Sequence, residues 1–246
     1  MHRTRVKICG LTRDEDVRAA CALGADAVGF VCYPGSPRYV APERLAALAQ
    51  ALAPFVTPVL LFVNASRSEV ERAVAAVPQA LLQFHGAEDP RFCAAFGRPY
   101  VRALAVAAGV DLLEFEQRFS TAAAVLADTP ADGPGNAPGE AAAPAVASGG
   151  AGSGPVFGGA GRTFPWDRLA APERRRLPLI LAGGLRADNV AQAIAQVQPY
   201  AVDVSSGVEA ARGVKDAGRM RDFLAAVRMA DARPRPDPQA VHGGGA

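Results

Sequence analysis

Short strand-like runs alternate with amphipathic helical patterns along almost the whole sequence, and this alternation restricts the possible folds more than any other feature. Residues 5–9 have the alternating pattern of a strand, residues 13–23 have helical periodicity, and Gly24 ends that helix. The order then repeats, which gives about eight strand–helix units. The predicted strands are residues 5–9, 27–31, 58–63, 81–84, 100–103, 123–128, 179–182 and 201–204. Because strands separated by helices pair in parallel with the helices outside, the sequence predicts an α/β protein.

Two architectures are compatible with this alternation. Eight units within 246 residues fit a closed (β/α)8 barrel, the TIM barrel. The alternative is an open, doubly wound sheet, which usually has a Gly-x-Gly-x-x-Gly turn after its first strand. Here the first strand leads into Cys9-Gly10-Leu11-Thr12, which lacks that turn. We therefore expect a single-domain (β/α)8 barrel.

Two segments interrupt the pattern. Residues 129–156 follow the sixth predicted strand, are rich in Ala, Gly and Pro, and contain hardly any large apolar residue. Such a segment cannot pack a core, so we expect a disordered loop insert. Residues 230–246 contain three prolines and a glycine run, and we expect a disordered tail there. The predicted domain is one barrel over residues 1–229, including the insert, followed by the tail.

The composition excludes several classes of partner. The chain has 26 Lys and Arg against 24 Asp and Glu, so no bulk charge favours nucleic acid or a membrane surface. No apolar run resembles a signal peptide or a transmembrane helix. The cysteines and histidines lack metal-ligand spacing; they are Cys9, Cys21, Cys32, Cys93, His2, His85 and His242. We expect a cytoplasmic protein with reduced thiols, no metal and no cofactor.

Polar and ionisable residues occur at nearly every predicted strand end, whereas the strand interiors are aliphatic. In a (β/α)8 barrel these carboxyl-terminal ends form the active site. The residues at or just after the ends are Cys9, Arg38, Asn64, His85, Arg102, Asp128, Gly183 and Asp203. A nearly complete ring of this kind is difficult to explain as solvated loops, so it predicts a functional site.

Cys9 has a second feature that suggests chemistry. Lys7 lies two residues earlier and therefore on the same face of the strand. A nearby ammonium favours the thiolate, so Cys9 is predicted to accept a proton near neutral pH. The alternative is that Cys9 is a small buried apolar residue, as most single cysteines are.

Two predicted loops are suited to binding phosphate. Gly183-Gly184-Leu185 follows the seventh strand, and Ser205-Ser206-Gly207 follows the eighth. Glycine and serine expose backbone N–H groups that can bind an anion without a lysine. Either loop alone could be an ordinary tight turn, but together they predict a small phosphorylated ligand.

The chain resembles the phosphoribosylanthranilate isomerase family of tryptophan biosynthesis from Val6 to Val227, apart from the insert. The resemblance is carried by Lys7-Ile8-Cys9-Gly10-Leu11-Thr12, by Leu82-Gln83-Phe84-His85-Gly86, and by residues 36–40, 126–129, 158–164, 181–185, 203–209 and 213–216. Three features depart from the family pattern: Ala160 replaces the usual Thr or Ser, Pro165 replaces an Asp before Trp166, and the insert is longer. These departures concern the loop over the site rather than the expected acid and base.

The resemblance implies an isomerase that carries out an Amadori rearrangement of N-(5-phosphoribosyl)anthranilate. It implies that Asp128 is the general acid that opens the sugar ring and that Cys9 is the general base at carbon 2. It also implies that Arg38 binds the anthranilate carboxylate and that His85 and Asp203 bind the ribose. Gly183, Gly184, Ser205, Ser206 and Gly207 are expected to bind the phosphate. The protein is expected to be a monomer or a homodimer.

Three other functions stay open at this stage. The aminoimidazole carboxamide ribotide isomerase of histidine synthesis uses two aspartates, whereas Cys9 ends the first strand here. Indole-glycerol phosphate synthase needs lysines and glutamates at several strand ends, which Arg102 and the scarcity of lysines disfavour. A non-catalytic sugar-phosphate-binding barrel could lose its acid or base, but both Cys9 and Asp128 are present.

Overall fold

The computed structural model describes residues 3–106, 110–128, 166, 169 and 174–233. The predicted insert at residues 129–156, Ala160, Pro165 and most of the predicted tail lie outside the described residues.

Eight parallel strands form a closed barrel in chain order. They are β1 (Arg5–Cys9), β2 (Ala27–Val31), β3 (Thr57–Phe62), β4 (Leu81–Phe84), β5 (Tyr100–Ala105), β6 (Ala124–Asp128), β7 (Leu179–Leu181) and β8 (Ala201–Val204). The barrel closes because β1 pairs with both β2 and β8. This closure confirms the predicted (β/α)8 barrel and excludes the open sheet.

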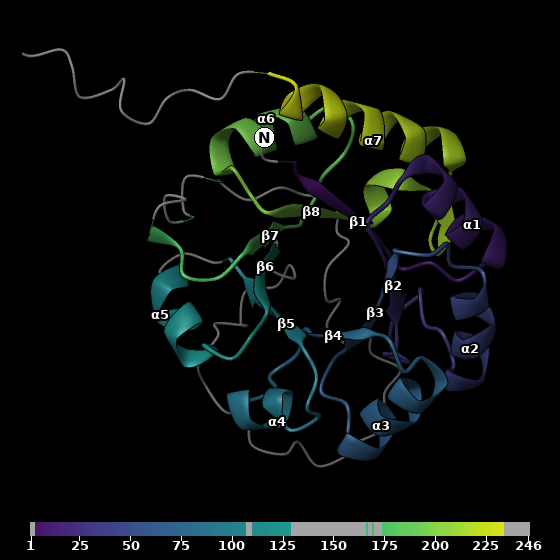
Figure 1. The fold of residues 1–246 in the computed structure, drawn as a ribbon, viewed down its shortest axis with the longest axis vertical. Helices are drawn as coiled ribbons and strands as arrows, with labels where there is room; N and C mark the ends of the chain where they lie inside the picture. Colours follow the sequence, from purple (N-terminus) through teal and green to yellow (C-terminus); the bar gives the residue numbers. More distant parts are fainter. Residues whose placement is uncertain (1–2, 107–109, 129–165, 167–168, 170–173, 234–246) are drawn as a thin grey trace, which may run out of the picture.

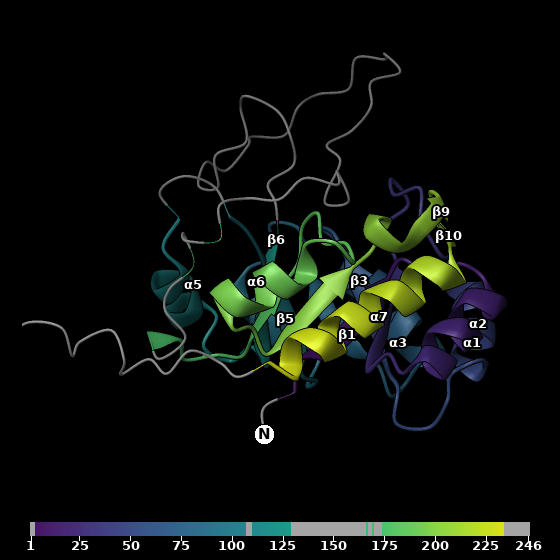
Figure 2. The same cartoon turned by 90° about the horizontal axis from the view of Figure 1, so that it is seen from above.

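The described helices surround the strands, as Figure 1 shows. They are α1 (Asp14–Leu23), α2 (Pro42–Gln50), α3 (Arg67–Ala76), α4 (Pro90–Ala94), α5 (Leu112–Arg118), α6 (Val190–Val197) and α7 (Ala217–Asp231). After β8 the chain forms a short 3-10 helix, η3 (Ser206–Val208), and an antiparallel pair, β9 (Glu209–Ala211) with β10 (Val214–Lys215). Figure 2 shows β9 and β10 at the end of the barrel away from the amino terminus.

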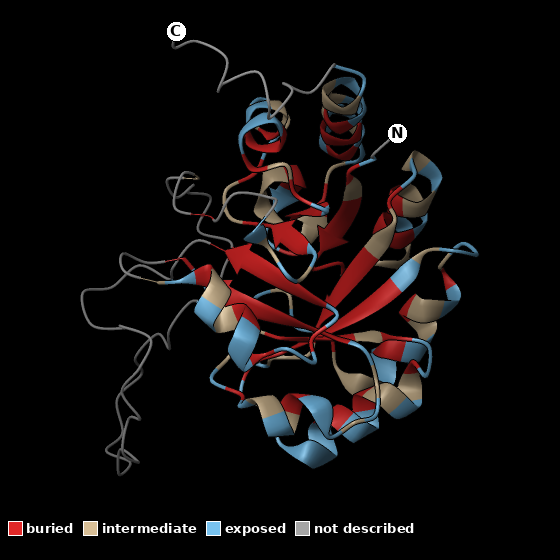
Figure 3. Ribbon diagram, turned by 60° about the vertical axis from the view of Figure 1, so that its left-hand side comes forward, coloured by how far each residue is buried: buried red, intermediate tan, exposed pale blue. Residues whose placement is uncertain are grey.

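The strands are buried on both faces, which is why their sequences read as nearly continuous apolar runs. The outer layer packs Ile8, Phe30, Leu60 and Phe84 against the helices, and all four are fully buried. A second cluster, of smaller residues, fills the barrel; it contains Val101, Ala103, Ala124, Leu126, Ile180, Ala182 and Ala201. Figure 3 shows the resulting pattern, with buried strands in the middle and exposed residues on the helices.

Helix ends follow the local sequence. Ser66 and Glu69 form a capping box at the start of α3, and Asp216 caps α7. The α7 helix continues to Asp231, so the predicted start of the tail at residue 230 is wrong by two residues. The reason is tertiary, because the backbone N–H and the hydroxyl of Thr4 both donate to the Asp231 carboxylate at 2.7 Å.

No helix within the described ranges is both long enough and apolar enough to cross a membrane.

Candidate active site

A pocket opens at the carboxyl-terminal end of the barrel strands. The ten residues to which the sequence assigns a catalytic or binding role line it: Cys9, Arg38, His85, Asp128, Gly183, Gly184, Asp203, Ser205, Ser206 and Gly207. Asn64 and Arg102, which also belong to the predicted ring of strand-end residues, do not line it. Its empty volume is about 710 Å³, including space open to solvent. A hollow at this end of the barrel, bordered by polar groups from several strands, is the usual place for a small-molecule site in this fold.

Other lining residues were given no role by sequence reasoning. They include Tyr33, Ser36 and Gln83, together with an apolar set formed by Val31, Leu61, Val63, Ala182, Leu185 and Val204. Ser36 lies in the loop after β2 and Gln83 near the end of β4, so both could have been found from their position relative to the strands. The apolar residues continue ordinary strand runs, so the sequence carries no signal that separates them from the core.

The Cys9 thiol lies at the end of β1, between a cation and an anion. Lys7 points inward on the same strand, and its Nζ donates to Asp203 Oδ1 of β8 at 3.0 Å. The registry of β1 with β8 sets this contact, since Lys7 pairs directly with Asp203. Gly29 of β2 leaves room for both side chains, because a Cβ there would lie 2.8 Å from Cys9 Sγ and 3.1 Å from Lys7 Cε.

The electrostatics of Cys9 differ from the sequence-based expectation. Burial raises the pKa of the thiol, the Lys7 ammonium lowers it and the Asp203 carboxylate raises it again, so the pKa lies above its ordinary value. Lys7 lowers the pKa of Cys9, as the sequence predicts, but burial and Asp203 outweigh this effect in this structure. Burial also opposes the charge of Lys7, but Asp203 and Cys9 outweigh it and raise the pKa of Lys7. Lys7 is thus a permanent cation whose charge is largely balanced by Asp203.

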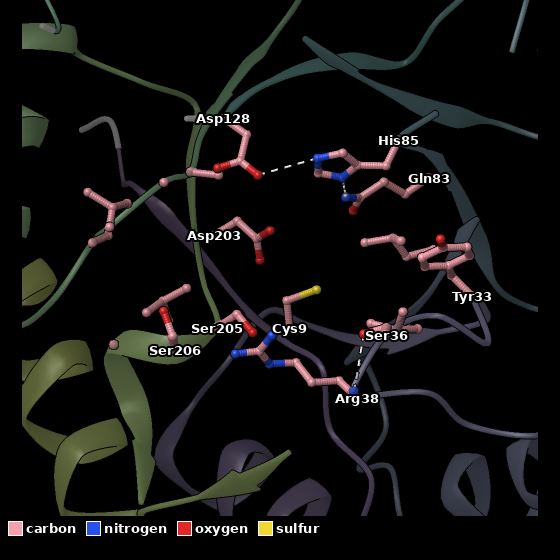
Figure 4. A pocket seen from close by; sticks show the side chains of 18 of the residues that line it. Cys9, Tyr33, Ser36, Arg38, Gln83, His85, Asp128, Asp203, Ser205 and Ser206 are labelled. Carbon is pink, nitrogen blue, oxygen red and sulfur yellow. Dashed lines mark hydrogen bonds and ion pairs between the residues drawn. The ribbon is translucent and has the colours of Figure 1, made fainter. Parts of the chain in front are cut away.

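The Asp128 carboxyl ends β6 and opens into the same pocket as the thiol. Figure 4 shows the two groups pointing into the pocket, with Asp203 between them in that view. His85, just after β4, brings its Nε2 to 3.3 Å from Asp128 Oδ2. The Nε2 of the Gln83 side chain lies 3.3 Å from the other ring nitrogen, Nδ1. A thiol and a carboxyl on different strands of the barrel therefore border one pocket.

Arg38 forms a buried ion pair that the sequence did not predict. Its Nε and Nη2 donate to Glu209 Oε1 and Oε2 at 2.8 Å and 2.7 Å. Lys215 Nζ donates to the same Oε1 at 2.8 Å, and so does the backbone N–H of Gly213 at 3.2 Å. Burial tends to raise the pKa of Glu209, but Arg38 and Lys215 outweigh it and the pKa lies below its ordinary value. One edge of the Arg38 guanidinium is thereby occupied by Glu209.

The loops after β7 and β8 pack against each other beside the pocket. Gly183 and Gly184 have φ values of 84° and 62°, which glycine adopts without strain. Gly207 lies so close to the β7 loop that a Cβ would sit 2.0 Å from the carbonyl oxygen of Leu185. Lys215 Nζ donates to the Ser205 carbonyl oxygen at 3.1 Å and so holds the start of the loop after β8 in place.

Within the described part of the chain, no group of three or more His, Cys, Asp or Glu side chains is placed to hold a metal ion.

Comparisons with known proteins agree on one family. The profile of the N-(5'phosphoribosyl)anthranilate (PRA) isomerase family matches residues 6–226. An N-(5'-phosphoribosyl)anthranilate isomerase of Methylibium petroleiphilum is 50% identical over 231 residues, covering 94% of this chain and 97% of the relative.

Solved structures lead to the same family. The phosphoribosyl anthranilate isomerase of Thermotoga maritima has a TM-score of 0.74 and 35% identity, over 92% of this chain and 99% of that one. A phosphoribosyl anthranilate isomerase in complex with reduced 1-(o-carboxyphenylamino)-1-deoxyribulose 5-phosphate has a TM-score of 0.68 and 32% identity, over 92% of this chain and 99% of that one. The chain therefore belongs to the N-(5'-phosphoribosyl)anthranilate isomerase family.

Proposed function

We propose that this protein converts N-(5'-phosphoribosyl)anthranilate to 1-(2-carboxyphenylamino)-1-deoxyribulose 5-phosphate by an Amadori rearrangement in tryptophan biosynthesis. The observation that carries the proposal is that Cys9 and Asp128 line one pocket together with an arginine and two glycine- and serine-containing loops. An acid, a base, a carboxylate ligand and a phosphate site are the four elements that this reaction needs. Family membership and the relative crystallised with a reduced product support the same substrate.

Asp128 acts first, as the general acid. It donates its proton to the furanose ring oxygen while the bond from that oxygen to carbon 1 breaks. The nitrogen lone pair of the substrate forms the C=N bond, which leaves an open-chain, protonated Schiff base. Proton transfer from a positioned acid contributes about 10²–10⁴-fold to the rate of such a step.

Cys9 acts next, as the general base. The thiolate removes the proton from carbon 2, and the electrons of that C–H bond form the C1=C2 double bond and neutralise the nitrogen. The resulting enolamine then loses its hydroxyl proton at oxygen 2 and gains a proton at carbon 1, which gives the ketone. Although the pKa of Cys9 lies above its ordinary value, the adjacent cationic Schiff base and Lys7 both favour the thiolate at the moment of transfer.

The remaining residues hold the substrate. The phosphate binds to backbone N–H groups of Gly183, Gly184 and the loop from Ser205 to Gly207, because such loops bind anions without a lysine. Arg38 binds the anthranilate carboxylate, and Glu209 holds the guanidinium in place for that contact. Asp203 and His85 border the ribose between the acid and the base.

The test is the loss of substrate fluorescence when purified protein is incubated with phosphoribosylanthranilate generated in situ. We expect turnover by the wild type, and a decrease of about 10²–10⁴-fold or more for Cys9→Ala and for Asp128→Ala, with normal folding by circular dichroism. Cys21→Ala on α1 and Asp188→Ala at an exposed position are matched controls and should keep activity. A folded wild type that leaves the fluorescence unchanged would refute the function, and full activity in either site variant would refute that residue's role.

A further inference from the structure

The Asp128 carboxyl is linked to a chain of two side chains that sequence reasoning did not connect. His85 Nε2 lies 3.3 Å from Asp128 Oδ2, and His85 Nδ1 lies 3.3 Å from Gln83 Nε2. Both contacts are drawn in Figure 4. Gln83 is only 1% exposed, and among the described residues its Oε1 is buried without a hydrogen-bond partner. Burying an amide oxygen without a hydrogen-bond partner destabilises the folded protein, so a Gln at this position beside Asp128 needs an explanation.

The assigned orientation of the Gln83 amide determines the tautomer of His85. The amide nitrogen can only donate, so Nδ1 must present its lone pair. A neutral imidazole with a lone pair on Nδ1 carries its proton on Nε2. That N–H then donates to Asp128 Oδ2, which must be an unprotonated oxygen to accept it.

The backbone on both sides of His85 is held in place by a buried arginine. Arg102 Nη1 donates to the carbonyl oxygen of Phe84 at 2.8 Å, and Nη2 donates to that of Gly86 at 2.7 Å. Glu88 Oε2 accepts the backbone N–H of Gly86 at 2.8 Å. These contacts hold the backbone at His85 in place, and the ring itself is oriented by its contacts with Asp128 and Gln83.

We propose that Gln83 and His85 are positioning residues for the general acid. Gln83 holds His85 as the Nε2–H tautomer, and this N–H reserves Oδ2 of Asp128, so the acid proton is carried on Oδ1. The inference rests on the proposed function and adds which carboxyl oxygen of Asp128 donates the proton in the acid step.

The proton balance of the acid step follows directly. The Oδ1–H bond of Asp128 breaks as the new O–H bond forms at the ring oxygen, and His85 keeps its own proton throughout. The negative charge that develops on the carboxyl is stabilised by the Nε2–H hydrogen bond. Hydrogen bonds that strengthen as charge develops are those that accelerate a reaction.

The first experiment reads the tautomer directly. Nitrogen-15 NMR of histidine-labelled, full-length protein near neutral pH distinguishes Nε2–H, Nδ1–H and imidazolium forms. The chain has three histidines, and His85→Asn identifies the signal of interest. We expect the Nε2–H form in the wild type; an Nδ1–H or imidazolium form there overturns the inference.

The second experiment replaces the hydrogen-bond donor that faces His85 Nδ1 by an acceptor of nearly the same shape. In Gln83→Glu the carboxylate accepts from Nδ1, so His85 is protonated on Nδ1. His85 then either takes up the acid proton at Nε2 or pairs as imidazolium with the Asp128 carboxylate, and the acid is lost in both cases. We expect kcat to fall by about 10–100-fold with KM changed less than about twofold. Gln192→Glu, exposed on α6, adds the same charge outside the site and should leave kcat unchanged.

Gln83→Met keeps the inference testable if the buried charge impairs folding. It removes the partner of Nδ1 at nearly constant length, so both neutral tautomers should appear in the spectrum and kcat should fall less than in Gln83→Glu. Unchanged kcat in Gln83→Glu, or a single Nε2–H form in Gln83→Met, contradicts the role of Gln83. An inactive wild type that shows the Nε2–H form refutes the proposed function while supporting the tautomer assignment.

Discussion

At the scale of single residues, Cys9, the proposed base, lies near opposite charges. Burial and the Asp203 carboxylate raise the pKa of Cys9, and the Lys7 ammonium lowers it. The position of Cys9 at a strand end could be predicted from the sequence, and so could that of Asp128. The ion pairs could not, because Lys7 and Asp203 are 196 positions apart and Arg38 and Glu209 are 171 apart. Pairs so distant depend on the register of the closed sheet, which local patterns do not specify.

Removing Lys7 should make Cys9 a weaker proton acceptor at a given pH. Lys7→Met removes the ammonium that lowers the pKa of Cys9 and leaves Asp203 without its cation, so the pKa rises. The acid limb of the kcat/KM profile should move to higher pH, and alkylation of Cys9 by iodoacetamide should become slower at fixed pH.

Asp203→Asn provides the opposite change. The Asp203 carboxylate raises the pKa of Cys9, so its neutralisation should lower that pKa and speed alkylation. Mass spectrometry of the Cys9 peptide gives the rate, and Cys21 in the same samples is the internal control. Equal alkylation rates for wild type and Lys7→Met would show that Lys7 does not act on the thiol.

At the scale of elements, helix starts are marked most clearly by residues close together in the sequence. The capping box of α3, formed by Ser66 and Glu69, and Pro42 at the first turn of α2 are residue patterns that mark a helix start in the sequence itself. The α6 helix begins only at Val190. Asn189 Oδ1 accepts from the backbone N–H of Arg186 and its Nδ2 donates to the carbonyl oxygen of Gly184, which keeps the preceding stretch as a turn. Local contacts between one side chain and the backbone of its own loop therefore set this boundary.

The contact between the β7 and β8 loops leads to a prediction. Gly207→Ala would bring a Cβ to 2.0 Å from the Leu185 carbonyl oxygen, so the loops must separate. We expect weaker phosphate binding, seen as a raised KM and poorer inhibition by inorganic phosphate.

Gly97→Ala is the control for a glycine substitution. Gly97 has a φ of 61° and open space where a Cβ would lie. Its replacement should cost about 1–2 kcal/mol of stability through backbone strain alone and leave KM unchanged. If Gly207→Ala binds phosphate as well as the wild type does, the loops do not depend on this packing.

At the scale of the whole molecule, Glu209 joins distant parts of the barrel rim. It binds Arg38, which follows β2, and Lys215 of β10. These ion pairs stabilise the folded state. Because the folded-state pKa of Glu209 lies below its ordinary value of 4.5, their stabilisation is fully present above pH 4.5. It is lost as the pH falls through the folded-state pKa.

Glu209→Gln should therefore flatten the acid side of the stability profile. Near neutral pH, urea unfolding should show a loss of about 3–5 kcal/mol, because Arg38 and Lys215 stay buried without their carboxylate. The difference from wild type should shrink as the pH drops below about 4. Glu43→Gln, exposed on α2, should behave like the wild type; an equal difference at both pH values would assign the effect to packing instead.

The joint between the first and last barrel strands has a consequence for synthesis on the ribosome. β1 is made first, yet one of its two edges can be paired only when β8 emerges, after residue 204. At about 5–20 residues per second this wait is roughly 10–40 s. During that time the nascent chain exposes a strand edge of the kind that recruits other chains, so closing the ring is also what ends its exposure to aggregation.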